Sequence, residues 1–265
     1  MSLALTLIAF LIAVTAAVRS TWSPCGLSML STITPLAEQG RGHRFRSTAS
    51  WFVIGAVVGG LTLGLAMAAL AAVIATFGLA PATLLALATA ALLVTAVSDS
   101  RLLGHQLPNH PRQVNERWLD QYRSWVYGAG FGWQIGVGLA TYIMTAAVYA
   151  LIMLGALTAS PPTALALGVT FGLVRGLAIL LGLSITSPAS LVAFHRRFDA
   201  WREPVRRGTV VVQAVAATIA GAVTWGLTPP TLAVAVLASV CVVATMRTTL
   251  QPAASAPTTA ATTPA

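Results

Sequence analysis

The chain has 265 residues, of which 57% are hydrophobic and only 8% are charged. A soluble domain carries roughly 25% charged residues because its surface faces water. This chain has too little polar surface to cover itself, so we expect lipid to be part of its solvent. The formal net charge is +9, but no basic stripe with interleaved aromatic residues lies outside the apolar stretches. This excludes nucleic acid as a partner.

The first apolar run starts at Leu3 with no basic residue before it, so it lacks the charged start of a secretory signal. We predict one long first element from Leu3 to about Ala37. It should break near Pro24, because an interior proline removes a backbone hydrogen bond and kinks or splits a helix.

Further apolar stretches predict about seven crossings and therefore an all-α integral membrane protein forming a single transmembrane domain, 1–247. Their approximate ranges are 49–77, 81–97, 125–157, 162–183, 209–226 and 231–246. The last is short for a span, so six crossings followed by a re-entrant segment stay open as an alternative. The uncharged, Ala/Thr/Pro-rich tail 248–265 is predicted to be disordered.

The basic residues are all arginine, and they alternate strictly between connections. The predicted loops 38–48, 98–124 and 184–208 carry clusters of arginine, whereas the turns near Gly78, Ser160 and Thr228 carry none. In a cell (inner) membrane, arginine-rich loops stay on the cytoplasmic side. We therefore predict a cytoplasmic face bearing the three arginine loops and an N-terminus outside.

Two of these loops contain a predicted surface helix. In 189–205 apolar residues form a stripe on one face of the helix, and arginine and aspartate lie on the opposite face. Ser187 followed by Pro188 fits the cap and first residue of this helix. A shorter stripe lies in 113–125. Such helices lie in the headgroup plane with arginine reaching toward anionic lipid, although docking of a protein partner is the alternative.

An internal repeat is predicted, with repeat one at about 3–97, repeat two at about 125–226 and an extra span at about 231–246. Gly55/Gly59 and Gly60/Gly64 of one half are answered by Gly168, Gly172 and Gly176 of the other. Small residues four apart let helix backbones approach closely. Because each unit has three spans, the copies would insert with opposite topology, as in many transporters.

Chemistry inside the spans is sparse. All six acidic residues fall in predicted loops or at their edges, and the four histidines form no ligand set with cysteine or acid, so we expect no metal and no cofactor. Arg19 and Arg175 are embedded in apolar sequence. An embedded arginine faces protein, water or a ligand, or else its side chain snorkels to the headgroups.

The segment 21–36 reads TWSPCGLSMLSTITPL and places Cys25 directly after the break-forming Pro24. Irregular backbone at membrane depth persists only where protein or a water cavity receives it. A thiol at a helix N-terminus can be reactive. The alternative is that Cys25 is a small apolar residue filling a corner.

The motif SPCGLSML…TPLAEQGRGHRFR…WFVIGAVVGG resembles the family of the cytochrome c biogenesis protein CcdA and the membrane domain of DsbD. The resemblance implies a three-plus-three scaffold that moves reducing equivalents from a thioredoxin-like partner through two membrane cysteines. Cys25 matches the first of these. The second position reads Ile135 or Gly136, and Cys241 lies beyond the six-span unit.

The favoured hypothesis is a small-solute transporter or exporter, rather than an enzyme, that has lost the two-cysteine relay. Its solute would pass between the halves, with anions favoured by Arg19 or Arg175. The predicted pathway residues are Pro24, Arg19, Gly132, Gln134, Gly136, Gly138 and Arg175. Two alternatives stay open: a thiol–disulfide electron relay in which Cys25 is catalytic, and a membrane scaffold or assembly factor.

Overall fold

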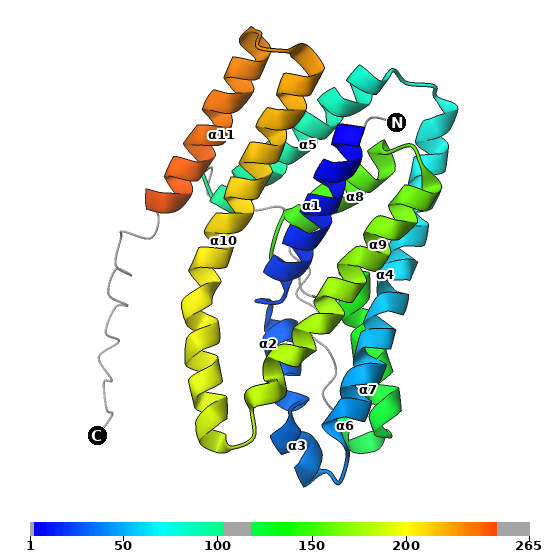
Figure 1. The fold of residues 1–265 in the computed structure, drawn as a ribbon, viewed down its shortest axis with the longest axis vertical. Coiled ribbons are helices and arrows are strands. Elements are labelled where there is room, and N and C mark those ends of the chain that lie inside the picture. Colours follow the sequence, from blue (N-terminus) through cyan, green and yellow to red (C-terminus); the bar gives the residue numbers. More distant parts are fainter. Residues whose placement is uncertain (1–2, 103–117, 142, 248–265) are drawn as a thin grey trace, which may run out of the picture.

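A computed structural model describes residues 3–102, 118–141 and 143–247 (Figure 1). The elements assigned in this part of the chain are all helices: α1 (Leu3–Ser20), α2 (Pro24–Thr32), α3 (Pro35–Gly40), α4 (Phe45–Thr76), α5 (Pro81–Ser100), α6 (Trp118–Gln121), α7 (Ser124–Val137), α8 (Ala147–Leu157), α9 (Pro161–Leu177), the 3-10 helix η1 (Ala178–Ser184), α10 (Pro188–Trp225) and α11 (Pro229–Arg247). Six helical segments are long and apolar enough to cross a membrane. The prediction of an all-α membrane protein is confirmed.

Proline and capping residues set many of the helix starts. Prolines begin α2, α3, α5, α9, α10 and α11, at the one position where a missing N–H costs nothing. Ser187 caps α10 with a reciprocal capping box formed with Ser190. The start predicted for this helix is therefore confirmed.

The helices run in opposite directions in the two halves of the chain. In Figure 1, α1, α4 and α5 run down, up and down, whereas α7 with α8, α9 and α10 run up, down and up. The connections before α4 and before α10 lie at the lower end, and those after α4, α8 and α10 lie at the upper end. Successive membrane crossings alternate in this way with or without a repeat, so the inverted repeat stays a prediction. Helix α11 follows the two halves as an addition.

Glycine allows the second helices of the two halves to meet backbone to backbone. A Cβ added at Gly60 would collide with the Gly168 carbonyl, and one added at Gly172 would collide with the Ala56 carbonyl, so α4 and α9 touch through bare backbone. Gly55 and the residues after it bring α4 equally close to α7. The packing predicted from glycine spacing is present.

The outer surface is apolar, as a lipid-facing surface must be. On α1 the exposed large residues recur at steps of three and four, while the opposite face is buried; the exposed residues are Leu3, Leu7, Leu11, Val14 and Val18. On α11 the exposed residues include Leu232, Val236, Val240 and Val243. Such exposure would be unfavourable in water and fits a surface covered by acyl chains.

Several predicted boundaries need correction. Residues 189–205 do not form a separate surface helix, because α10 is continuous from Pro188 to Trp225 and contains Pro204 in its interior. Part of the other predicted surface helix, 113–117, and the tail 248–265 lie outside the described residues. Within the described part, α6 covers only Trp118–Gln121 and α7 begins separately at Ser124.

Candidate functional site

Two helix breaks face each other inside the bundle. The first separates α1 from α2 at Thr21–Ser23, directly before Pro24, as predicted. The second separates α7, which ends at Val137, from α8, which begins at Ala147. A broken helix leaves unpaired carbonyls at its end and unpaired N–H groups at its new start. Away from water these groups need partners.

Arg175 of α9 receives the ends of both broken helices. It is only 3% exposed, and its Nη1 donates to the Ile135 carbonyl at 2.7 Å while its Nη2 donates to the Ser20 carbonyl at 3.3 Å. Its guanidinium also lies 5.6 Å from the ring centre of Phe171. A helix C-terminus carries partial negative charge, so one cation neutralises two such ends. Arg175 is therefore buried and does not snorkel to the headgroups.

Asp99 plays the converse role at the start of α8. Its Oδ1 accepts a hydrogen bond from the Ala146 N–H at 2.8 Å, and its Oδ2 accepts bonds from the Thr145 hydroxyl at 2.7 Å and the Gln213 amide at 3.1 Å. A carboxylate at a helix N-terminus is favourable. Asp99 lies in the last turn of α5, which ends at Ser100, so it stands at a loop edge as expected. Its contacts with α8 and α10 were not expected.

An ion pair between Arg206 and Glu203 lies next to Asp99. Arg206 of α10 donates to both carboxylate oxygens of Glu203, at 2.9 and 2.6 Å, and to the Asp99 carbonyl at 3.2 Å. It also reaches the Thr245 carbonyl of α11 at 3.5 Å. Arg206 thereby ties together the ends of α5 and α11. Arg19, in the last turn of α1, lies near this group and is 4% exposed.

The interface between the breaks is closed. A cavity of about 10 Å³ lies there, bounded by Thr21, Gly26, Met29, Leu30, Phe52, Ile135, Arg175, Ala178 and Ile179. This is close to the smallest volume that holds one water molecule. A larger hollow of about 450 Å³ lies at the upper end of the bundle, between Leu5, the α4–α5 turn and the α8–α9 turn.

The predicted pathway residues do not line one common path. Arg175 and Gly138 lie at the closed interface, and Gly138 has a positive φ of 73° that favours glycine. Gly132 and Gly136 instead face α4, where an added Cβ would collide with the carbonyls of Phe52 and Ala56. Gln134 is half-buried on α7, and Pro24 is exposed at the start of α2.

The two cysteines occupy different parts of the bundle. Cys25 is buried in α2, in the same cluster as Met29, Phe52 and Ile135, whereas Cys241 is buried on α11. Neither takes part in a disulfide.

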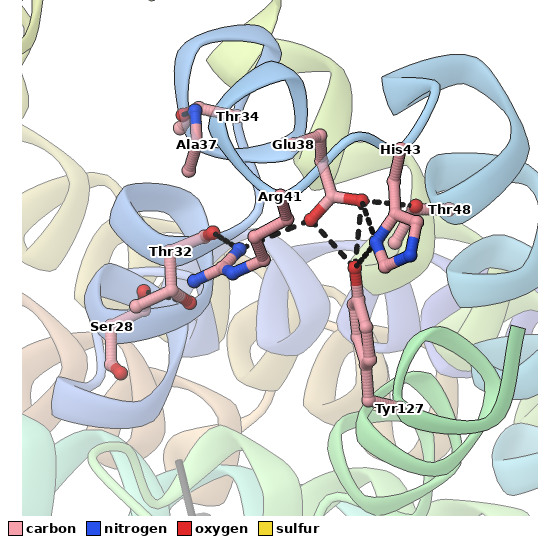
Figure 2. A network of polar contacts seen from close by, with 9 residues as sticks. All are labelled: Ser28, Thr32, Thr34, Ala37, Glu38, Arg41, His43, Thr48 and Tyr127. Atoms are coloured by element: carbon pink, nitrogen blue, oxygen red, sulfur yellow. Dashed lines mark hydrogen bonds and ion pairs between the residues drawn. The ribbon is translucent and has the colours of Figure 1, made fainter. Parts of the chain in front are cut away.

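A second polar network lies at the lower end of the bundle (Figure 2). Glu38 of α3 is 0% exposed. It accepts hydrogen bonds from the Tyr127 hydroxyl, the Thr48 hydroxyl and Arg41 Nη1, and the Tyr127 bonds measure 2.8 and 2.7 Å. His43 Nδ1 lies 3.2 Å from the same Tyr127 oxygen. The network joins α3 and α4 of the first half to α7 of the second.

These networks contain residues that the sequence did not single out. Asp99, Gln213 and Tyr127 sit at helix ends or on spans with no quoted motif around them, and Glu38 lies in the quoted motif without having been given a role. A polar residue within an apolar helix, such as Gln213, is the one available signal. Its partner can be identified only once the helices are placed.

The chain is similar to three proteins called methylamine utilization protein MauF. Identity is 27% over 165 residues in Paracoccus versutus, 31% over 175 residues in Paracoccus denitrificans and 25% over 204 residues in Methylophilus methylotrophus. The matches cover 62%, 63% and 76% of this chain. The chain spans 60% of the length of the two Paracoccus proteins and 70% of the third.

No family model matches the chain, and no solved structure matches it. The predicted membership of the CcdA/DsbD family is wrong, because the relatives carry the MauF name. The proline of this pair begins α2, and basic loops between apolar stretches are common to membrane proteins of many families. Neither feature is specific to a thiol relay.

Proposed function

We propose that this chain is a multi-pass membrane protein with an accessory role in methylamine utilization, and that it acts by moving a small solute between its two halves. The similarity to proteins named for methylamine utilization supports the first part. The paired helix breaks support the second. The relatives are named for the utilization of methylamine, but this name does not identify the solute that the chain would move.

One observation carries the transport proposal: each half contributes a charged side chain that holds the broken helix of the other half. Arg175, from the second half, binds the end of α1, and Asp99, from the first half, binds the start of α8. Backbone broken at membrane depth is favourable only where such partners exist. Hydrogen bonds between halves can be exchanged when the halves move, whereas those within a continuous helix are fixed.

The closed cavity fits an occluded state of such a transporter. The interface holds about 10 Å³, while the upper end opens into a hollow of about 450 Å³. Movement of one half against the other would open the breaks alternately to the two sides.

Growth of the organism that encodes this chain tests the proposal. Deletion of the gene should abolish or strongly slow growth on methylamine and leave growth on succinate with ammonium unchanged. The wild-type gene and Arg202→Gln should restore growth, because Arg202 is an exposed arginine that pairs with the exposed Asp199. Arg175→Gln should fail to restore it while reaching the membrane in equal amount. Normal methylamine growth of the deletion strain would refute the accessory role. Rescue by Arg175→Gln would refute the proposed role of Arg175 at the interface between the two halves.

A further inference from the structure

Helices α2 and α3 together form a short arm, residues 24–40, between the first helix break and the start of α4. The α2 part of the arm contributes Gly26, Met29 and Leu30 to one wall of the closed cavity. The opposite wall comes from α4, α7, α9 and η1, and it includes Arg175. Displacement of the arm would therefore open the cavity beside Arg175.

The arm is attached at its first end by a hinge. At Thr21–Ser23 the backbone N–H groups bond the carbonyls three residues earlier, so the α-helical ladder is interrupted there, and Pro24 has no N–H to restore it. Short stretches of this kind inside a helix often mark a hinge. The arm also packs against few residues of η1, α4 and α7, whereas α4 meets α7 backbone to backbone at Gly55.

The far end of the arm is fastened by one buried carboxylate (Figure 2). Glu38 of α3 accepts hydrogen bonds from the Thr48 hydroxyl of α4 and the Tyr127 hydroxyl of α7. It also accepts one from Arg41 Nη1 at 3.2 Å, and the same Nη1 donates to the Thr32 carbonyl at the end of α2. Glu38 thus holds both helices of the arm against α4 and α7.

This fastening requires the ionised form of Glu38. The ionisable groups that face it are Arg41, His43 and Tyr127, while α4 contributes the Thr48 hydroxyl and η1 has no ionisable side chain. An ionised carboxylate only accepts hydrogen bonds, so it suits a ring of donors. Protonation removes the charge that faces Arg41 and places a donor among donors, which weakens the fastening.

The histidines near the arm do not respond in the same way. Because the Tyr127 hydroxyl donates to Glu38, the network assigns His43 Nδ1–H as a donor to the Tyr127 oxygen at 3.2 Å. The Ser31 hydroxyl of α2 donates to its own helix, so His195 Nε2–H donates to Ser31 at 2.8 Å. Protonation of either histidine keeps its donor. Acid therefore breaks the contacts of Glu38 and preserves those of the histidines.

We propose that residues 24–40 are a proton-operated gate, which closes when Glu38 is ionised and swings open about the first break when Glu38 is neutral. This inference rests on the proposed transport function and assigns the gate of that same interface. The side chain of His43 is 34% exposed and supplies the proton. A proton taken up by its other ring nitrogen lets Nδ1–H pass to the Tyr127 oxygen as the Tyr127 O–H passes to Glu38.

Spin-label distances in purified full-length protein in lipid nanodiscs test the gate. In a Cys25→Ser/Cys241→Ser background, one label at Arg123→Cys, at the exposed start of α7, is paired with a label at Gln39→Cys on the exposed face of the arm. A second pair joins Arg123→Cys to Ser47→Cys at the exposed start of α4. The first pair follows the arm, and the second follows the contact between α4 and α7.

We expect Glu38→Gln, which is neutral at every pH, to add an arm distance longer by about 5 Å or more at about pH 7.5. The protein with Glu38 should show this longer distance only near about pH 4, where carboxylic acids ordinarily take up protons. The α4–α7 distance should stay constant throughout. Asp199→Asn, which neutralises an exposed acid, should leave both distances and their pH response unchanged.

Three results would overturn the gate. They are an unchanged arm distance in Glu38→Gln, an arm distance that does not respond to acid when Glu38 is present, and lengthening of both pairs together, which reports loss of the fold. Because the measurement contains no solute and no methylamine, its failure leaves the growth phenotype as a separate test of the transport proposal.

Discussion

Arg175 and Asp99 show how single charged residues make a broken membrane helix possible. A guanidinium sits where two helices end and a carboxylate sits where one begins, each matching the partial charge of the backbone it binds. The position of Arg175 inside an apolar stretch could be recognised from sequence. Its partners could not, because Ser20 and Ile135 offer only backbone carbonyls, which every residue has.

The Glu38 network gives a prediction at the same scale. Tyr127→Phe removes a donor from a fully buried carboxylate and should destabilise the protein by about 1–3 kcal/mol. A lower midpoint of thermal unfolding in detergent would report the loss. Tyr122→Phe is the matched control, since Tyr122 is exposed, and its midpoint should match that of the wild type. A midpoint for Tyr127→Phe equal to that of Tyr122→Phe would show that the network does not stabilise the fold.

Cys25 separates the transport proposal from a thiol relay. The side chain is buried beside the closed interface, and serine has nearly the same volume but no redox chemistry. We expect Cys25→Ser to restore methylamine growth of the deletion strain to within about twofold of the wild-type rate. Cys241→Ser should do the same. Loss of growth with Cys25→Ser alone, at an unchanged membrane level, would favour thiol chemistry and contradict the transport proposal.

At the scale of elements, prolines predicted the first helix break and a helix start correctly, whereas changes in composition did not predict where helices end. Pro24 located the first break and Ser187-Pro188 located the start of α10. The second break has no proline, and α7 stays helical to Val137. Gly132 and Gly136, which were predicted to line a pathway, pack against α4 instead. The sequence changes from charged to apolar near Gly208, where a loop was predicted to end and a span to begin. Helix α10 instead runs through this position without interruption.

The contact between α4 and α9 predicts opposite effects for one chemical change at two glycines. Gly60→Ala places a methyl group against the Gly168 backbone and should destabilise the protein by about 1–3 kcal/mol. Gly208→Ala meets nothing within 4 Å in helix α10 and should stabilise the protein by about 0.5–1 kcal/mol. Thermal unfolding of both variants in one detergent provides the comparison. An unchanged or raised midpoint for Gly60→Ala would show that α4 and α9 do not touch at Gly60.

At the scale of the whole molecule, the membrane-spanning helices and the charged loops were predictable because both follow from simple rules of length and charge. The lengths of the apolar stretches indicate where the helices lie, and clusters of arginine occur in alternate connections. The pairing of α4 with both α7 and α9 depends on which glycine faces which helix. That information is not contained in the spacing of glycines along one chain.

Movement of the halves predicts that Cys25 becomes accessible. In a closed bundle both thiols are buried, but opening of the interface would expose Cys25 and leave Cys241 between α11 and its neighbours. A small water-soluble methanethiosulfonate should therefore modify Cys241→Ser, which retains Cys25, at least tenfold faster than Cys25→Ser, which retains Cys241. Mass spectrometry of native protein over time measures both rates. Equal, slow rates would indicate a rigid scaffold.

The membrane orientation is the last prediction, and it follows from the whole set of loops. The arginine-bearing connections before α4 and α10 lie at one end of the bundle and the uncharged turns at the other (Figure 1), so the first end should face the cytoplasm. In a Cys25→Ser/Cys241→Ser background, Leu227→Cys should react with a membrane-impermeant maleimide in intact spheroplasts, because Leu227 is 91% exposed in the α10–α11 turn. Ser47→Cys, at the exposed start of α4, should react only after the membrane is permeabilised. The reverse labelling pattern would place the arginine loops outside and would reverse the direction assigned to both halves.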